Sequence, residues 1–549
     1  MWVLGINWRF HDASAALVDG DGVLWAFAEE ERFTRVKHAY DTLPTQAARH
    51  CLAAAGISWR DLDAIAVGWD LEEPERRRDY LEALFGPEVR GHKQPEFVCV
   101  EHHLSHALAS YHASGFSDAG VLVVDGSGEH HSISIFAADS TGLTLKRAWD
   151  RRYSLGALYE ATTRALGFGV LADGKTMGLS SYADASSVVD LPILDPLSDV
   201  RRPDCPVDMD PALRYDKFVE NGWMRYFEDR FGRVATSTDQ IHRDAVAVAM
   251  AGSAQHQVEQ TMRALLTETV SLSRSQNVCL SGGVALNCVA NGRLPEPLYV
   301  PPFPHDGGVA VGAAWYVCPP KNKVLLASPY LGTEISNGAA TSQLRDEGYT
   351  ISDFTPETVI EALLDGHIGA IAQGRAEIGP RALGHRSIIA LPRPAEVRDR
   401  LNALKRREVW RPFAPVTLPD YASRLWPSQG TRELYMVGNA VTSSHARQIA
   451  PAAVHVDGTT RPQVVHADGP GALVAILQGL DAISVPPVLI NTSFNDRGEP
   501  LVNSEAEAVA GFHRLGLDFL ILGDKFIKNP RRDSAAARPG SASRGVSSV

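Results

Sequence analysis

Several features that would narrow the class of protein are scarce in this 549-residue sequence. Its six cysteines form no CxxC pair, which favours reduced, mostly buried thiols over a disulfide framework or a zinc ribbon. No stretch approaches the roughly 20 apolar residues that a membrane helix needs, and the N-terminus has no basic region followed by an apolar one. We therefore expect a cytoplasmic protein with no membrane partner.

An excess of positive charge is also missing. The formal net charge is −12, from 53 basic and 65 acidic side chains, so the whole molecule does not attract a nucleic-acid backbone. We expect no nucleic-acid partner, and any anionic ligand must be held by local clusters. Lysine supplies only 10 of the basic residues, so a retained lysine weakly indicates a position that needs an ammonium group.

The length and the strand pattern together predict a duplicated α/β region. At roughly 150 residues per domain the chain has room for three or four folding units. Residues 3–7, 14–18 and 23–32 read as two strands, a tight turn and a third strand, and the same pattern recurs from residue 120. Such a repeat favours two lobes with a cleft between them, where polar turns after the strands bind ligands.

The sequence pattern changes near residue 320, in the segment PPKNKVLLASPYLGTE, which indicates a linker between two domains. We expect an N-terminal domain over residues 1–335 and a C-terminal domain over residues 350–528. Residues 529–549 are rich in Ala, Arg, Ser and Gly without apolar periodicity, so we expect a disordered tail.

A metal-binding pattern lies in the segment VEHHLSHALASYH, where two histidines are four residues apart and share one face of a helix. An isolated pair of this kind more often has a structural role, but two aspartates in polar turns could complete a metal site. The candidate ligands are His102, His106, Asp125 and Asp306. Mixed nitrogen and oxygen ligands suit Fe, Mn or Zn without choosing among them. His103 and His130 remain alternative ligands.

Glycine turns and an arginine-rich segment predict binding of a phosphorylated ligand. The segments SGGVALN and DGKTMG could offer backbone amides to a phosphate or ribose, although helix–strand packing is an equally ordinary use of glycine. In an acidic chain, a concentration of guanidinium groups between glycines and prolines favours an anion pocket over a solvated face. These basic residues are Arg375, Arg381, Arg386, Lys405, Arg406, Arg407, Arg411 and Arg461.

Taken in order, the motifs resemble the carbamoyltransferase family of antibiotic-tailoring and nodulation enzymes. The matching segments run from about residue 4 to residue 508 and include LGINWRFHDASAALV, EEERFTRVKH, EHHLSHALASYHASGF, VVDGSGEH, DGKTMGLSSY, LSGGVALN, PHDGG, GPRALGHRSI, LNALKRREVWRPFAP and INTSFNDRGEPLVNSEAEA. The resemblance implies an α/β fold with a duplicated actin/hexokinase-like N-terminal domain, followed by an α+β YrdC-like domain.

The resemblance also implies two coupled reactions. The C-terminal domain would form carbamoyl-adenylate from carbamoyl phosphate and ATP with Mg²⁺, and the N-terminal domain would transfer the carbamoyl group to a hydroxyl of a small molecule. Because the intermediate would hydrolyse in water, we expect both sites to face one closed chamber. Macrolactam, aminoglycoside, cephem and lipooligosaccharide hydroxyls all fall within the range of the family. The acceptor is expected to be an antibiotic, with a slight preference for a macrolactam.

The same resemblance assigns roles to individual residues. It implies the four metal ligands named above, with Fe expected ahead of Mn or Zn. The nucleotide would lie along Gly174, Gly282, Gly283, Asn287, Arg381, Lys405, Arg411 and Arg461. Carbamoyl phosphate would be held by Arg411, Arg461, Ser493 and Asn495. His11 is the candidate general base, because a near-neutral imidazole suits that proton transfer, and Lys37 would neutralise an oxyanion or hold a phosphate.

Three alternative functions fit the sequence less well. A sugar kinase of the same N-terminal fold would not explain the histidine pair or the arginine-rich domain. A tRNA threonylcarbamoyl transferase conflicts with the net charge, and a non-catalytic nucleotide sensor conflicts with motifs that are intact in both domains.

Overall fold

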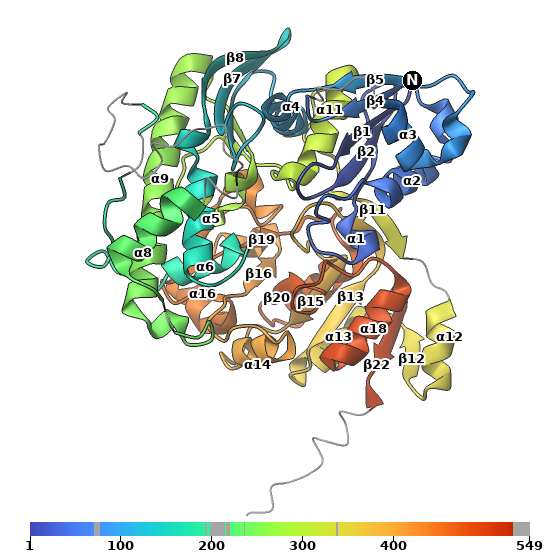
Figure 1. The fold of residues 1–549 in the computed structure, drawn as a ribbon. Coiled ribbons are helices and arrows are strands. Elements are labelled where there is room, and N and C mark those ends of the chain that lie inside the picture. Colours follow the sequence, from blue (N-terminus) through green and yellow to red (C-terminus); the bar gives the residue numbers. More distant parts are fainter. Residues whose placement is uncertain are drawn as a thin grey trace, which may run out of the picture.

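The computed structural model describes residues 1–70, 77–192, 195–197, 215, 220–234, 236–335 and 339–530. The segment expected to be a disordered tail therefore lies almost entirely outside the described residues. Two lobes built from the first 320 residues lie side by side, and the C-terminal domain packs beneath them (Figure 1).

The first lobe is built on a five-stranded sheet of order β3-β2-β1-β4-β5. Its strands are β1 Val3–Asn7, β2 Ser14–Val18, β3 Leu24–Glu29, β4 Ala64–Val67 and β5 Glu96–Cys99. Its helices are α1 Glu31–Thr34, α2 Thr45–Ala54, α3 Arg77–Phe85 and α4 His102–Ser114. The first three strands pair antiparallel, and β4 and β5 extend the sheet in parallel from β1.

The second lobe repeats this arrangement in a sheet of order β10-β9-β6-β7-β8. Its strands are β6 Ala119–Val124, β7 Ile133–Asp139, β8 Gly142–Trp149, β9 Val278–Ser281 and β10 Leu298–Tyr299. Its helices are α5 Leu155–Ala165, α6 Asp173–Ser180, α8 Arg225–Phe231, α9 Ala245–Ser273 and α10 Cys288–Gly292. Helix α11 Val309–Val317 follows in the chain but packs on β1, β2 and β4 of the first lobe. Because each lobe has an antiparallel meander followed by two parallel strands, the duplicated α/β region expected for an actin/hexokinase-like fold is confirmed.

The C-terminal domain contains an eight-stranded mixed sheet of order β12-β22-β21-β13-β15-β20-β16-β19, which confirms an α+β unit. Its strands are β12 Thr350–Asp353, β13 Gly369–Ala372, β15 Arg386–Ala390, β16 Ala414–Thr417, β19 Gln463–Val464, β20 Val488–Ser493, β21 Phe519–Leu522 and β22 Lys525–Lys528. Two small sheets pair β11 Tyr330–Ile335 with β14 Gly374–Glu377 and β17 Ala440–Val441 with β18 Thr459–Thr460. The helices are α12 Ala339–Asp346, α13 Pro356–Leu364, α14 Val397–Leu404, α15 Pro419–Ala422, α16 Ser444–Ile449, α17 Gly471–Ala482 and α18 Glu505–Leu515.

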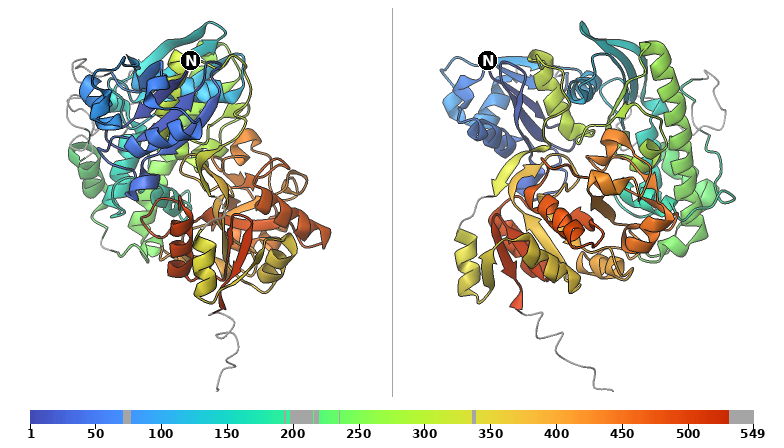
Figure 2. Two further views of the ribbon diagram at one scale, coloured as in Figure 1. Left: turned by 90° about the vertical axis from the view of Figure 1, so that its right-hand side faces the viewer. Right: turned by 180° about the vertical axis from the view of Figure 1, so that it is seen from behind.

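The seam between the domains is itself part of the apolar core. Trp410, Tyr435 and Val437 of the C-terminal domain are buried in the same cluster as the residues of the second lobe. The views from the side and from behind show the C-terminal domain lying against both lobes (Figure 2). Continuous apolar burial at this seam favours one rigid arrangement of the domains.

Helices α4 and α11 lie between the two sheets and pack against each other. At Gly312 in α11, an added Cβ would lie 1.7 Å from the carbonyl oxygen of Ser105 in α4. At Gly5 in β1, a Cβ would lie 1.8 Å from the carbonyl oxygen of Ala310. Only glycine, which has no Cβ, permits these approaches, so the spacing of α4, α11 and β1 depends on glycine at these two positions.

We expect Gly312→Ala to lower the free energy of unfolding by about 1–3 kcal/mol, because the added methyl group must push α4 and α11 apart. Urea denaturation followed by circular dichroism measures this change. The matched control is Gly471→Ala in α17, where a Cβ would meet no atom within 4 Å. Equal stability of the two variants would contradict the proposed role of this contact.

Candidate functional site

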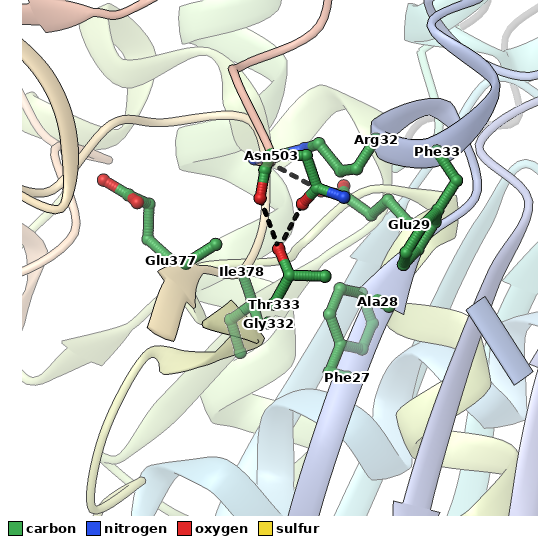
Figure 3. Close-up of a pocket in the computed structure, with 11 residues that line it drawn as sticks. Phe27, Ala28, Glu29, Arg32, Phe33, Gly332, Thr333, Glu377, Ile378 and Asn503 are labelled. Carbon is green, nitrogen blue, oxygen red and sulfur yellow. Dashed lines mark hydrogen bonds and ion pairs between the residues drawn. The ribbon is translucent and has the colours of Figure 1, made fainter. Parts of the chain in front are cut away.

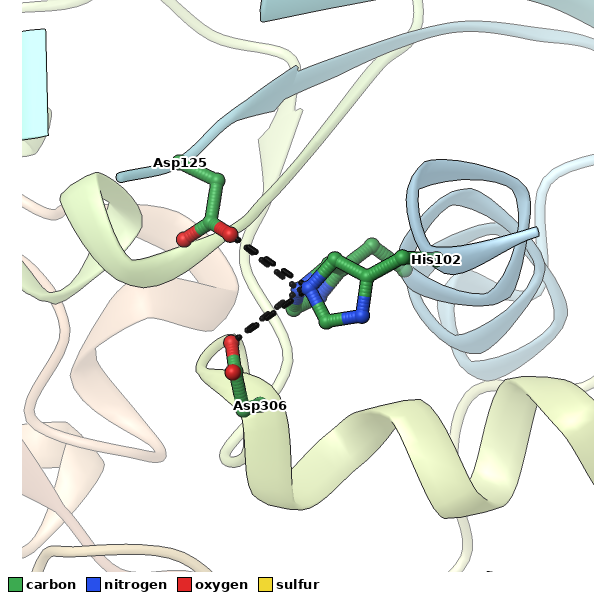
Figure 4. A group of neighbouring side chains, drawn as sticks. His102, Asp125 and Asp306 are labelled. Carbon is green, nitrogen blue, oxygen red and sulfur yellow. Dashed lines mark hydrogen bonds and ion pairs between the residues drawn. The ribbon is translucent and has the colours of Figure 1, made fainter. Parts of the chain in front are cut away.

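Four buried side chains come together where the two lobes meet. His102 and His106 project from the first turn and a half of α4, Asp125 follows β6, and Asp306 begins the 3-10 turn Asp306–Gly308 that leads into α11. One ligand atom from each lies within 4.8 Å of the others, and none of the four is more than 6% exposed. The sequence-predicted metal cluster is thus brought together in space (Figure 4).

The distances within this cluster are short enough for one ion to contact all four groups. The two Nε2 atoms of His102 and His106 are 3.2 Å apart. His102 Nε2 lies 3.4 Å from Asp125 Oδ2 and 3.6 Å from Asp306 Oδ1, while His106 Nε2 lies 3.5 Å from Asp306 Oδ1. Two imidazole nitrogens and two carboxylate oxygens form a donor set that suits Fe, Mn or Zn.

Neighbouring groups orient these donors. His102 Nδ1 donates to the carbonyl oxygen of Gly68 at 3.3 Å, and His106 Nδ1 lies 3.4 Å from Ser281 Oγ. The ring of Trp69 stacks on His102 with centroids 4.1 Å apart, and the backbone N–H of Gly283 donates to Asp125 Oδ1 at 2.8 Å. The contact with a carbonyl oxygen requires a proton on Nδ1 of His102, so the Nε2 lone pair of its neutral ring faces the centre of the cluster, as in protein metal sites.

The electrostatics of the cluster also fit a cation. Burial acts to raise the pKa of Asp306, but His11 and His102 outweigh it and hold the pKa well below its usual range. The pKa of Asp125 is lowered in the same way by the two histidine ligands. Two ionised carboxylates side by side in a buried site repel each other, and a bound cation removes that repulsion.

A chain of acids and histidines extends from this cluster. His11 Nδ1 lies 3.0 Å from Asp12 Oδ2 and 3.8 Å from Asp306 Oδ2, and Asp12 Oδ1 lies 2.9 Å from His38 Nδ1. Burial acts to lower the pKa of His11, but Asp306 and Asp12 outweigh it and raise the pKa to about 10. These surroundings favour the imidazolium, whereas the predicted general base requires a neutral ring. The proximity of His11 to the cluster is as expected, but its charge state is not.

Lys37 lies between this site and the C-terminal domain. Its side chain reaches the solvent. The protein packed around it nevertheless displaces water and so lowers the pKa of Lys37, and the positive charges of Arg411 and Arg381 lower this pKa further. Arg411 and His11 are each 30% exposed although protein surrounds them closely. The charges of Asp12 in the first lobe and of Arg411 and Arg381 in the C-terminal domain all act on Lys37, so charged groups of both domains lie near this lysine.

The arginines of the C-terminal domain separate into two groups. Burial, with Arg461 and Arg411 nearby, lowers the pKa of Arg381 to about 9. The Nε atoms of Arg381 and Arg461 are buried and have no hydrogen-bond partner. Unpartnered guanidinium N–H groups in a region of repelling positive charges are suited to an anion. Arg381 makes one long hydrogen bond, 3.4 Å from Nη2 to the carbonyl oxygen of Leu286. Arg386 Nε also lacks a partner, but the terminal N–H groups of Arg375 and Arg386 donate to several backbone carbonyls of the strands β11 and β14 and their neighbours.

Several predicted nucleotide or carbamoyl phosphate ligands have structural partners. Lys405 Nζ donates to the carbonyl oxygens of Ser493 and Asn495 and to Asn495 Oδ1, which uses all three of its N–H groups. Gly282 adopts φ of 91° where a Cβ would lie 2.3 Å from the carbonyl oxygen of Val124. Asn287 caps α10 by accepting from the N–H of Ala290. These residues shape the site through the backbone.

Gly174 differs from these positions, because an added Cβ would meet no atom within 4 Å. It lies in the first turn of α6, next to Lys175, whose ammonium group donates to Glu408 of the C-terminal domain at 2.9 Å. Sequence reasoning missed Lys175 and Glu408. The scarcity of lysine in the sequence weakly indicated Lys175, but no local sequence pattern showed that Lys175 and Glu408 would be in contact.

A separate pocket lies at the seam of β3, β11 and β14, with Arg32, Glu377, Thr333 and Asn503 among its lining residues (Figure 3). It adjoins a surface hollow of about 450 Å³. None of the sequence-predicted site residues lines either space. Within the described part of the chain, no helix is both long and apolar enough to cross a membrane.

Comparison with known proteins agrees with this arrangement of two domains. The family described as "Carbamoyltransferase N-terminus" matches residues 2–84 and 76–315, and "Carbamoyltransferase C-terminus" matches residues 360–529. Nodulation protein NolNO of Sinorhizobium fredii is 31% identical over 95% of this chain and 79% of its own length. Nodulation protein NolO of Bradyrhizobium diazoefficiens is 31% identical over 78% of this chain and 79% of its own length.

Similarity to solved structures is remote. The activator of the 2-hydroxyisocaproyl-CoA dehydratase from Clostridium difficile, solved with bound ADPNP, aligns with 58% of this chain and 94% of its own at 12% identity and a TM-score of 0.33. That value is too low to support an argument about function. The two family matches cover both domains, and the chain therefore belongs to the carbamoyltransferase family and is an enzyme of that family.

Proposed function

We propose that this enzyme is an ATP-dependent O-carbamoyltransferase that makes carbamoyl-adenylate in its C-terminal domain and uses it in its N-terminal domain. Carbamoyl phosphate, ATP and water would give carbamoyl-adenylate, pyrophosphate and phosphate. An acceptor hydroxyl would then take the carbamoyl group and release AMP. The observation that carries this proposal is that Lys37 lies near charges of both domains: Arg411 and Arg381 on one side, and on the other Asp12, which adjoins His11 at the edge of the two-His, two-Asp cluster.

The C-terminal arginines fit the first step. Burial and the nearby charge of Arg461 lower the pKa of both Arg381 and Arg411, so phosphates that bind among these guanidinium groups would relieve their repulsion. Lys405 fixes the loop that contains Ser493 and Asn495, and this loop borders the arginines in the proposed donor site. Mg²⁺ bound to ATP would further neutralise the phosphates.

The four-residue cluster fits the second step. His102, His106, Asp125 and Asp306 would hold a divalent transition metal, which supplies Lewis-acid stabilisation of the charge that develops on the carbonyl oxygen. His11 lies at the edge of the cluster and would receive the hydroxyl proton. The positive charge of a metal would offset the carboxylates that raise the pKa of His11. Lys37 would lie along the path between the two sites.

The close contact of the domains supports one chamber for both reactions. Arg35 of the first lobe donates to the carbonyl oxygens of Pro500 and Leu501 at 2.9 and 2.7 Å, and Trp410 Nε1 donates to that of Thr238 at 2.9 Å. Such contacts on both lobes limit the escape of a reactive intermediate. The acceptor is proposed to be a hydroxyl of an antibiotic natural product; incubation of the enzyme with acceptors of several chemical classes, followed by mass spectrometry, tests this class.

We expect His102→Ala to lower metal affinity by at least about 10–100-fold, because it removes a direct ligand. That range is the usual cost of removing a side chain that only supports a metal ligand by a hydrogen bond. Carbamoyl transfer should fail while the first ATP-dependent burst of pyrophosphate is retained. Elemental analysis and a pyrophosphate assay measure the two effects. The matched control is His112→Ala, which alters a histidine of the same helix outside the cluster. Unchanged metal content in His102→Ala would refute the ligand set.

We expect Arg461→Ala to reduce pyrophosphate formation from ATP and carbamoyl phosphate by about 100–1,000-fold, as when a preorganised donor is lost. Metal content should stay at the wild-type value, since Arg461 lies in the other domain. The matched control is Arg398→Ala, an arginine of α14 that is 41% exposed and paired with Asp399. Normal pyrophosphate formation in Arg461→Ala would remove the C-terminal assignment.

A further inference from the structure

Residues 405–411 connect the two proposed sites. Lys405, Arg407 and Arg411 lie with the cations of the C-terminal domain. Glu408 and Trp410 face the second lobe of the N-terminal domain, where Trp410 packs 6.0 Å from the ring of Phe168. Neighbouring side chains in this short segment thus contact different domains.

Glu408 is the group in this segment that contacts cations of both domains. Its side chain is 1% exposed, and Oε1 lies 2.9 Å from Lys175 Nζ of the second lobe and 3.5 Å from Arg497 Nη2 of the C-terminal domain. Its Oε2 lies 3.6 Å from Arg411 Nη1 and forms no hydrogen bond. One buried carboxylate therefore lies within 3.6 Å of three cations from both sides of the domain seam.

Lys175 connects this carboxylate to the transfer site. It is in the first turn of α6, and its ammonium group lies 5.5 Å from the centroid of the Phe168 ring. The helix begins at Asp173, whose carboxylate lies close enough to His38 and His11 to interact with their charges. A shift of α6 would therefore change the edge of the transfer site as well as the seam.

Removing the charge of Glu408 should disturb both sides of the seam. A buried ion pair that loses one partner leaves the other charge uncompensated, which is strongly destabilising locally. Lys175 and Arg411 would then repel each other across the space that Glu408 occupies. We infer that Glu408 is a positioning residue that holds α6 against the cations of the C-terminal domain and so prevents the carbamoyl intermediate from escaping to water.

This inference rests on the proposed function, because it needs carbamoyl-adenylate to form in the C-terminal domain. Without an acceptor, a closed chamber retains the intermediate, and ATP consumption stops after one turnover. If the seam opens, water attacks the carbamoyl carbon, the bond to the adenylate phosphate breaks, and carbamate and AMP leave. The C-terminal domain can then consume ATP again.

The experiment incubates the full chain, loaded with its metal, with ATP, Mg²⁺ and carbamoyl phosphate and no acceptor. Pyrophosphate and AMP are followed over time, and hydroxylamine in the solution traps released carbamoyl-adenylate as hydroxyurea. We expect a single burst of pyrophosphate from the wild type. Glu408→Gln and Lys175→Met should each raise the subsequent rate of AMP release about ten-fold, since displacements of about 1 Å change reaction rates by up to about 100-fold.

A matched control separates this role from general support of the seam. Glu296 and Arg432 form another ion pair between the domains, 2.5 Å long and away from the cationic cluster. Glu296→Gln should leave the slow AMP release unchanged. A merely structural role for Glu408 would lower the melting temperature or the burst amplitude without raising AMP release.

The outcomes are distinguishable. No pyrophosphate burst from the wild type would refute the proposed function itself. A normal burst, with AMP release from Glu408→Gln and Lys175→Met equal to that of the wild type, would overturn only the role of Glu408. Because either variant alone suffices to show the effect, failure of one to fold still leaves the inference open to refutation.

Discussion

The contact between α4 and α11 is the constraint on which the rest of the structure depends. Gly312 lets the two helices approach until backbone meets backbone at Ser105. His102 and His106 are at the start of α4, and Asp306 lies just before α11, so this contact sets the distance between the histidines and one of the carboxylates. Asp125 is held from the second sheet through the N–H of Gly283. The fold and the site are therefore linked by helix spacing that a single methyl group would alter.

The charge distribution explains why the two sites suit a shared substrate. The cluster at the lobes carries carboxylates whose charges are only partly balanced, and the C-terminal cluster carries guanidinium groups that repel one another. Each cluster gains stability from a ligand of opposite charge, a cation in the first and phosphates in the second. In the proposed reaction, the phosphates of the nucleotide would meet the cations, and the carbonyl group of the carbamoyl intermediate would reach the four-residue cluster. Lys37 and Glu408 lie between these two environments.

Much of the fold could be predicted from local sequence patterns, whereas the hydrogen bonds and ion pairs around the site could not. Alternating strands, the turns after them and the spacing of His102 and His106 are properties of short segments, and each has the predicted form. The hydrogen bonds of Arg386 could not be predicted in this way, because two of its backbone acceptors, Thr333 in β11 and Gly374 in β14, are brought to it only by the fold. The same holds for Glu408, whose partner Lys175 is 233 residues away along the chain.

The excess of arginine over lysine has a structural origin in the seam. Arg32, Arg35, Arg375 and Arg432 each donate to carbonyl oxygens of the other domain or lobe. A planar guanidinium group keeps its charge when buried and presents several N–H groups in a fixed plane, so it can join irregular backbone segments that have no strand pairing. Lysine remains where a compact ammonium group gathers acceptors at one point, as Lys405 does with three oxygens and Lys175 with one carboxylate. The arginines were therefore an uncertain guide to an anion pocket, because the residues that bind phosphate and those that bind backbone differ only in what the fold brings to them.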